Sequence, residues 1–282
     1  MSKILALVDG SIYAESICGI SAWAANRLDL PVEVAHVLGR RIASSFDLSG
    51  SLEFNQRSAL LKEMADLDEQ HGKIAQRKGR AILESAKSVL QAAGVADVST
   101  RLRNGDLLEA LVELESEAAI VVIGKRGEAA DFARLHLGSN LERVVRSARK
   151  PVLVASRAYA PFDSFLIAYD GGRSANRAVD YVASSPLLKG MTCRLLSVGA
   201  DTTENRSRLE APAKLLENAG FTVASELLAG EPEEVIGNRI ESENIGLLVM
   251  GAYGHSRIRS LVIGSTTTAM VSRCKIPVLM FR

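Results

Sequence analysis

The feature that most constrains this chain is an internal repeat, in which two stretches of similar sequence follow one another. Several short segments recur in the same order in both stretches. They pair Asp9-Gly10 with Asp170-Gly171, residues 90–94 with 216–220, Gly124 and Gly127 with Gly251 and Gly254, Gly138-Ser139 with Gly264-Ser265, and residues 151–153 with 277–279. Matches that keep one order indicate a duplicated domain. We therefore expect domains at residues 1–156 and 162–282, joined by a short linker.

The two copies differ in length near the end of the first predicted helix–strand unit. Asp9 and Asp170 are 161 positions apart, whereas Gly138 and Gly264 are 126 apart. The first copy therefore holds roughly 35 extra residues, which we place as an insert at about residues 40–75. Apolar residues recur mostly at helical spacing from residue 56 to residue 90. The insert either gives the first copy a longer version of the helix that we expect at residues 209–218 of the second copy, or forms an arm for a partner or for dimerisation.

Each copy alternates short apolar segments with segments of helical pattern. We predict strands at residues 4–8, 31–38, 98–102, 120–123 and 152–155, and again at 165–169, 192–198, 222–228, 247–250 and 278–281. Helices are expected between them, at 14–28, roughly 57–93, 107–117 and 139–148 in the first copy. Such alternation predicts an α/β fold with two tandem, mostly parallel sheets that carry helices on both faces.

Charge and hydropathy exclude several classes of function. The formal net charge is +1, so no overall field draws the chain to nucleic acid or to an anionic membrane. No apolar run approaches the ~20 residues of a transmembrane helix. The three cysteines are scattered and the four histidines lack metal-ligand spacing, so neither disulfides nor a metal centre is expected. We expect a cytoplasmic protein.

Glycine-rich segments of the second copy lie where an α/β sheet binds ligands. They are Asp170-Gly171-Gly172 after the first strand, Gly251 to Gly254 after the fourth, and Gly264-Ser265-Thr266 before the last helix. In an open parallel sheet, ligands bind beyond the carboxyl ends of the strands. Glycines let the backbone approach a ligand, and free N–H groups at a helix start bind anions. These segments therefore predict a phosphate-binding edge.

The spacing Gly251-x2-Gly254-x9-Gly264-Ser265 resembles the G-x2-G-x9-G-[S/T] signature of ATP-binding universal stress proteins. The resemblance covers nearly the whole chain, twice, apart from the insert, so the chain is similar to a tandem universal stress protein. It implies an adenine nucleotide alpha hydrolase-like fold, with five parallel strands per domain and the nucleotide across their carboxyl edge.

Carried onto this sequence, the resemblance also implies roles for single residues. Asp170, Gly171 and the backbone near Val198 would meet adenosine. The groups that would hold ribose and phosphates are Gly251, Gly254, Gly264, Ser265 and Thr266. Tyr253 flanks the proposed site, where it either stacks on adenine or packs in the core.

The first copy keeps the same framework but departs from the pattern. Its corresponding residues are Asp9, Val37, Gly124, Gly127, Gly138 and Ser139. Ten residues, rather than nine, separate Gly127 from Gly138. Glu128 and Asp131 in that loop would repel a polyphosphate, an effect that the neighbouring Lys125 and Arg126 partly offset. We therefore expect the second copy to hold the better site.

The resemblance implies a protein that binds ATP or AMP, with or without Mg²⁺, and acts in stress response or regulation through a protein partner yet to be identified. A slow ATPase or self-phosphorylating enzyme stays open as an alternative, as does a scaffold for another small molecule. No catalytic residue is evident. Family resemblance further implies that the fifth strands pair, here Val152–Ala155 with Val278–Phe281 inside one chain, and leaves a homodimer open.

Overall fold

The computed structural model describes residues 2–39, 54–127, 138–252 and 265–282, with the backbone alone at 54–59, 265–267 and 269. The first half contains β1 (Lys3–Leu7), α1 (Ala14–Leu28), β2 (Val32–Leu38), α2 (Phe54–Ala92), β3 (Val98–Asn104), α3 (Leu107–Leu114), β4 (Ala118–Gly124), α4 (Ser139–Ser147) and β5 (Val152–Ala155). The second contains β6 (Ser164–Ala168), α5 (Arg173–Ser184), β7 (Thr192–Val198), α6 (Thr203–Asn218), β8 (Val223–Leu228), α7 (Pro232–Ser242), β9 (Leu247–Gly251), α8 (Ser265–Arg273) and β10 (Val278–Phe281).

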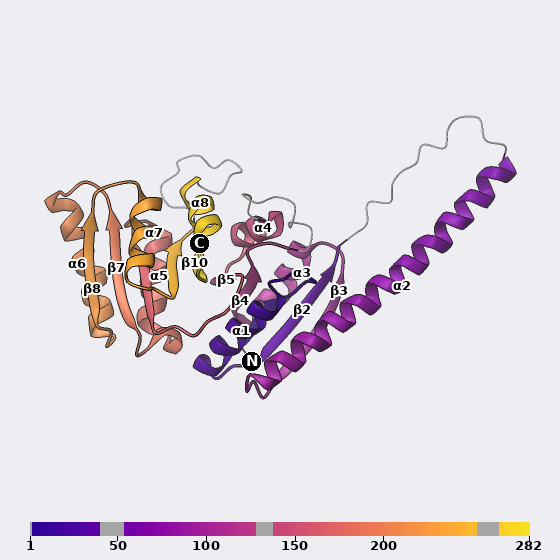
Figure 1. Cartoon of the computed structure of the whole chain (residues 1–282), viewed down its shortest axis with the longest axis horizontal. Coiled ribbons are helices and arrows are strands. Elements are labelled where there is room, and N and C mark those ends of the chain that lie inside the picture. The colour runs from indigo at the N-terminus through magenta and orange to yellow at the C-terminus, as the bar shows by residue number, and fades with distance from the viewer. Residues whose placement is uncertain (1, 40–53, 128–137, 253–264) are drawn as a thin grey trace.

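The strands form one continuous sheet of ten, in the order β3-β2-β1-β4-β5-β10-β9-β6-β7-β8 (Figure 1). Within each half the strands are parallel, and the order of the second half mirrors that of the first. Their near-continuous apolar runs suit strands buried on both faces. The predicted α/β class, with a five-stranded parallel sheet in each copy, is confirmed.

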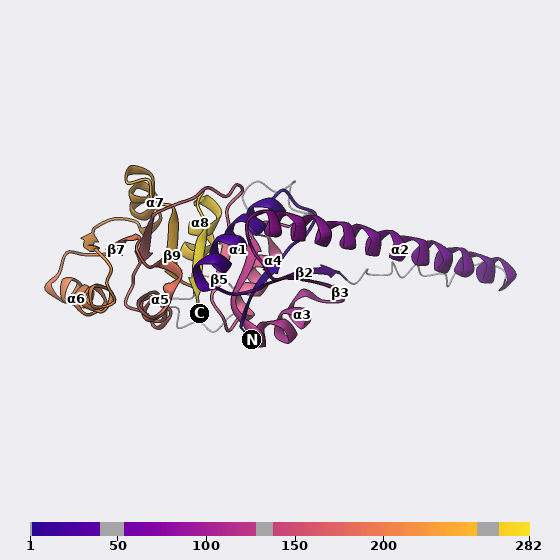
Figure 2. The same ribbon diagram turned by 90° about the horizontal axis from the view of Figure 1, so that it is seen from below.

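Helices cover both faces of the sheet, and each face has its own hydrophobic core (Figure 2). One core takes side chains from α1, α2, α5 and α6, including Ile17, Leu90 and Leu216. The other takes side chains from α3, α4, α7 and α8, including Leu111 and Val144. In the described residues, no helix is both long and apolar enough to cross a membrane.

The two halves meet through β5 and β10, which we call the central strand pair. These strands are antiparallel, and Leu279 lies opposite Leu153, with Val278 opposite Val154. Both leucines are fully buried. Each half thereby covers the edge strand that the other would expose. The predicted pairing of the fifth strands within one chain is confirmed.

Side chains of α1 also contact the linker and the turn after α5 in the second half. Trp23 of α1 packs against Phe162, with ring centroids 4.8 Å apart and the ring planes tilted by 48°. Arg27, at the end of the same helix, donates through Nε to the carbonyl of Leu187 (2.8 Å) and through Nη2 to that of Lys189. These contacts add to the central strand pair, so the halves form one packed body.

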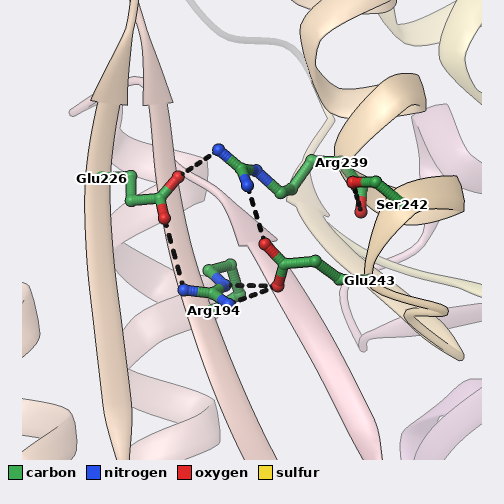
Figure 3. A network of polar contacts seen from close by, with 5 residues as sticks. All are labelled: Arg194, Glu226, Arg239, Ser242 and Glu243. Atoms are coloured by element: carbon green, nitrogen blue, oxygen red, sulfur yellow. Dashed lines mark hydrogen bonds and ion pairs between the residues drawn. The ribbon is translucent and has the colours of Figure 1, made fainter.

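A closed network of charges joins the outer strands of the second half to α7 (Figure 3). Arg194 of β7 contacts Glu226 of β8 (3.3 Å) and Glu243 (2.8 Å). Arg239 of α7 contacts the same two carboxylates, at 2.6 Å and 2.8 Å. Each charge therefore meets two of opposite sign, which offsets the cost of partial burial.

Part of the extra length of the first copy lies in α2, which has 39 residues against 16 in α6. The helix α2 lies between β2 and β3 as α6 lies between β7 and β8. Its C-terminal part packs on the sheet through buried Leu83, Ala86 and Leu90. Its N-terminal part extends away from the sheet (Figures 1 and 2). The helix is thus a lengthened version of its counterpart, as one of the two interpretations expected.

Two buried thiols predict how stability changes at alkaline pH. Burial raises the pKa of Cys18 to about 11 and that of Cys193 to about 12, both from 9.0. A group whose pKa is higher in the folded state stabilises that state at every pH below its pKa in the unfolded chain. This contribution is lost as the pH rises through the pKa of the folded state. We expect the free energy of unfolding to decline from pH 9.0 towards about 11. The Cys18→Ala/Cys193→Ala variant should show a shallower decline in urea unfolding at several pH values. Equal slopes would contradict this.

Candidate functional site

The strand order places a switch point in each half, at the carboxyl ends of two central strands. In the first half it lies between β1 and β4, because β2 and β5 extend the sheet in opposite directions from them. In the second half it lies between β6 and β9. Loops that leave the two strands of a switch point diverge and open a crevice, which is where such sheets bind ligands.

A cavity of about 560 Å³ occupies the switch point of the first half. The residues predicted from the sequence that line it are Asp9, Val37, Gly124, Gly127 and Gly138. Ser139, also predicted, is the first residue of α4. Buried apolar side chains, such as Leu7 and Leu141, form part of its wall. Its volume is within the ~300–1,000 Å³ of typical small-molecule sites.

Glycines allow the loops around this cavity to pack closely. Asp9 follows β1, and its Oδ1 accepts a hydrogen bond from the backbone N of Ser11 (3.1 Å). A Cβ on Gly127 would lie 2.9 Å from the Oδ2 of Asp9. The backbone N of Gly138 donates to the carbonyl of Lys125 (3.2 Å). The loop after β4 and the start of α4 therefore form one wall, which a larger side chain would force apart.

The structure adds polar residues that sequence reasoning missed. Asp106 precedes α3, and its Oδ1 accepts a hydrogen bond from the backbone N of Leu108 (2.8 Å). Its Oδ2 lies 2.6 Å from Nη2 of Arg143 in α4. The Arg143 guanidinium lowers the pKa of this carboxyl. Both residues line the cavity, as does Arg126. Gly105-Asp106 follows the third strand as Gly230-Glu231 does in the second copy. This repeated pair is the sequence signal that could have identified Asp106.

Lys125 departs from the sequence interpretation, which assigned it to offset the acidic residues of its loop. Its side chain is buried, and Nζ donates to the carbonyl oxygens of Cys274 and of Ile276 (3.2 Å to the latter). Burial lowers the pKa of this ammonium. The two carbonyls follow α8 of the second half, where a positive charge also suits the helix dipole. Lys125 thus joins the loop of the first site to the second half.

This arrangement predicts that Lys125→Met lowers the stability of the whole chain. Methionine keeps the apolar stem but removes the donor from the partly buried carbonyls of Cys274 and Ile276, and the loss of such a charged donor costs about 1–3 kcal/mol. Denaturant unfolding of the variant and of wild type measures the change. Lys150→Met, at an exposed position, is the matched control and should stay within about 0.5 kcal/mol of wild type. Equal losses in both variants would contradict the assignment.

The structure places part of the predicted site of the second half. Asp170 follows β6 and accepts a hydrogen bond from the backbone N of Gly172 (2.8 Å), across Gly171 with its φ of +74°. Val198 ends β7 and Gly251 ends β9. The predicted residues Tyr253, Gly254 and Gly264 lie outside the described residues, as do Glu128 and Asp131 of the first copy. Ser265 and Thr266 begin α8, but their side chains also lie outside the described part of the chain.

A cation that the sequence analysis missed, Arg208, lies beside Gly171, the residue after Asp170. A Cβ on Gly171 would lie 2.8 Å from Cδ of Arg208 in α6. Arg208 also pairs with Glu204 at 2.7 Å. Among the described residues, no group of His, Cys, Asp and Glu side chains gathers as metal ligands would.

Comparison with known proteins gives consistent matches over the whole chain. The family model described as Universal stress protein family matches residues 1–156 and 161–282. A universal stress protein of Synechocystis, Slr1230, is 38% identical over 100% of both chains. The crystal structure of a universal stress protein from Archaeoglobus fulgidus has a TM-score of 0.70 at 20% identity and covers 99% of this chain and 98% of that one. A functionally unknown Pseudomonas aeruginosa protein, PA1789, has a TM-score of 0.60 at 15% identity, covering 100% and 92%.

Proposed function

This chain belongs to the universal stress protein family, and on that premise we propose that it binds ATP or AMP and acts by binding rather than by catalysis. The observation that carries the proposal is the cavity at the first switch point. There Asp9, Gly127 and Gly138 meet, and the start of α4 adjoins them. An acidic acceptor, close-packed glycines and a helix start are the groups that a nucleoside phosphate needs.

The cavity offers a partner for each part of such a ligand. Phosphates would lie beside Gly138 and Ser139, where the N–H groups in the first turn of α4 and the dipole of that helix favour negative charge. Arg126 lines the same cavity and would add a positive charge there. The carboxylate of Asp9 would accept from a ribose hydroxyl or the adenine amine. Val37 would present its backbone to adenine above the apolar wall.

Asp106 and Glu109 also line the cavity, and their charge bears on whether phosphates fit. Asp106 is paired with Arg143 at 2.6 Å. The pair brings no net charge to the phosphate end, and Glu109 and Arg126 carry opposite charges, so the start of α4 would set the sign there. Arg143 could also turn from Asp106 to a phosphate, since both anions attract the same guanidinium.

We propose a second site of the same kind in the second half, which would make residues 1–156 and 162–282 two nucleotide-binding domains. Asp170, Gly171, Val198 and Gly251 occupy the corresponding ends of β6, β7 and β9. Gly254, Gly264, Ser265 and Thr266 would hold the phosphates, with Mg²⁺ as a companion ion, and Tyr253 would lie against adenine. Occupancy would then alter the loops at the sheet edge, which a protein partner in the cytoplasm could recognise during stress.

The decisive experiment identifies the bound ligand. Mass spectrometry of small molecules released from the purified chain should find an adenine nucleotide. Isothermal titration of the stripped chain with ATP and with AMP should give heat and a stoichiometry of up to two per chain. A purified protein that carries no adenine nucleotide and shows no heat with either would overturn the proposal.

A further inference from the structure

The N-terminal part of α2 presents apolar side chains to solvent. We call residues 60–78 of this helix the arm. Contact with the sheet is close from Gly79 onward, where an added Cβ would lie 2.7 Å from Leu102. On the arm itself, Leu60, Leu67 and Ile74 are 38%, 48% and 59% exposed. Figures 1 and 2 show this part of the helix pointing away from the rest of the chain.

The apolar residues of the arm follow the heptad spacing of a coiled coil. Leu60, Met64, Leu67 and Ile74, with the polar His71 between the last two, are separated by alternating steps of four and three. Such steps keep one stripe of side chains facing a partner helix. Most of the stability of a helix in a protein comes from packing of its apolar face, which the arm lacks within its own chain, and glycine, here Gly72, weakens a helix by about 1 kcal/mol. The arm therefore has both a surface for a partner helix and a reason to need one.

We propose that the arm pairs with the arm of a second copy of this chain, as an antiparallel two-helix coiled coil. In the register that we assign, Met64 lies against the partner's Ile74, and Leu67 against the partner's His71. Two of the positions that flank this stripe are Glu63 and Arg77, both exposed. They are opposite in charge and lie on opposite sides of residue 69, the midpoint of the register, so Glu63 meets the partner's Arg77 on both sides of the two-fold axis.

Charge selects the antiparallel direction. In a parallel pair, Glu63 would flank the partner's Asp68, and Lys78 would face the partner's Lys78, so like charges would meet at both ends. In the antiparallel pair those contacts become Glu63 with the partner's Arg77 and Leu60 with the partner's Lys78. One like-charge contact remains, because Asp68 lies beside the axis and meets the partner's Asp68. Asp68→Asn should therefore tighten the dimer.

A groove at the base of the arm extends this surface. It has a volume of about 590 Å³ and lies between α1 and α2, with Ile12, Lys78 and Ala81 among its lining residues. Ile12 is 51% exposed. In the assigned register, the partner's Leu60 lies against Lys78, which is one of the lining residues of this groove. The two-fold axis repeats this contact on the other copy.

Charge exchange tests the register in the full-length chain. Sedimentation velocity and light scattering should show a concentration-dependent dimer for wild type. Glu63→Arg alone and Arg77→Glu alone each place like charges at both contacts, and each should weaken the dimer by about tenfold or more. An equimolar mixture of these two variants should form a heterodimer, because opposite charges then meet at both contacts. A mixture that does not associate would overturn the assigned register.

Two further variants test the surface and the direction. Leu67→Glu should give a monomer with an unchanged thermal unfolding midpoint, while Val112→Glu, at a 66% exposed site on α3, should leave the dimer intact. In Gln70→Cys the new thiol lies near the two-fold axis only in the antiparallel pair. Mild oxidation should therefore join residue 70 of one copy to residue 70 of the other by a disulfide. Wild-type chain that stays monomeric at every concentration, or a dimer that Leu67→Glu leaves unaltered, would overturn the proposal.

Discussion

Gly138→Val is expected to weaken nucleotide binding in the first half by at least about a hundredfold, or about 2.8 kcal/mol. A Cβ at this position would lie 3.2 Å from Cα of Arg126 and 3.4 Å from the carbonyl oxygen of Lys125. Both neighbours are backbone atoms, so they cannot rotate away as a side chain would. The added methyl groups would also fill the space beside the start of α4, where we place the phosphates.

Isothermal titration with ATP measures this loss. If both halves bind, the number of nucleotides bound per chain should fall from two to one, because the second site lies at the far switch point between β6 and β9. The matched control is Gly237→Val in α7, where an added Cβ meets no atom within 4 Å. That variant should bind as wild type does. Unchanged affinity and stoichiometry in Gly138→Val would rule out the first cavity as the nucleotide site.

Leu279→Ala in β10 is expected to destabilise both halves together, by about 2–5 kcal/mol. Leu279 lies opposite Leu153 in the central strand pair, and neither side chain is exposed. The substitution removes apolar contacts and leaves a cavity between halves that share one sheet. Because each half covers an edge strand of the other, a loss at this position should affect the unfolding of both.

Urea unfolding followed by circular dichroism measures the change. Leu215→Ala in α6 deletes the same atoms from a side chain that is 41% exposed, and it should cost much less because little packing is lost. A single transition that shifts as a whole would support the joint unfolding of the halves. A change in Leu279→Ala no larger than that in Leu215→Ala would contradict the importance of this pair.

Local sequence was sufficient to predict much of the fold. The apolar runs identified every strand in the described residues, and the alternation with helices gave the parallel sheets. The strands at 152–155 and 278–281 matched their predicted bounds, because proline and a short apolar run mark each clearly. The strand at 192–198 and the helix at 14–28 also matched, whereas α6 begins at Thr203, before the expected residue 209. Other boundaries moved by a few residues, as at β3, which continues to Asn104 through polar residues near the sheet edge.

The sequence also indicated the framework of the candidate site in the first half. Asp9, Gly124, Gly127 and Gly138 were predicted from their repeated positions and their chemistry, and the structure brings them around one cavity. Such residues can be found in sequence because glycine and aspartate act through the backbone at fixed places after a strand. The corresponding residues of the second half are only partly described, so their binding role stays a prediction.

By itself, therefore, the sequence determined the duplication, the order of strands and helices, and the positions of the glycine loops, because each depends on residues close together in the chain. Tertiary structure alone decided the rest. Arg143 pairs with Asp106 from another helix. Lys125 turns from the loop to carbonyls of the other half, 149 and 151 positions away. The direction of a long side chain is set by the partners that the fold brings near it, and no local pattern records them.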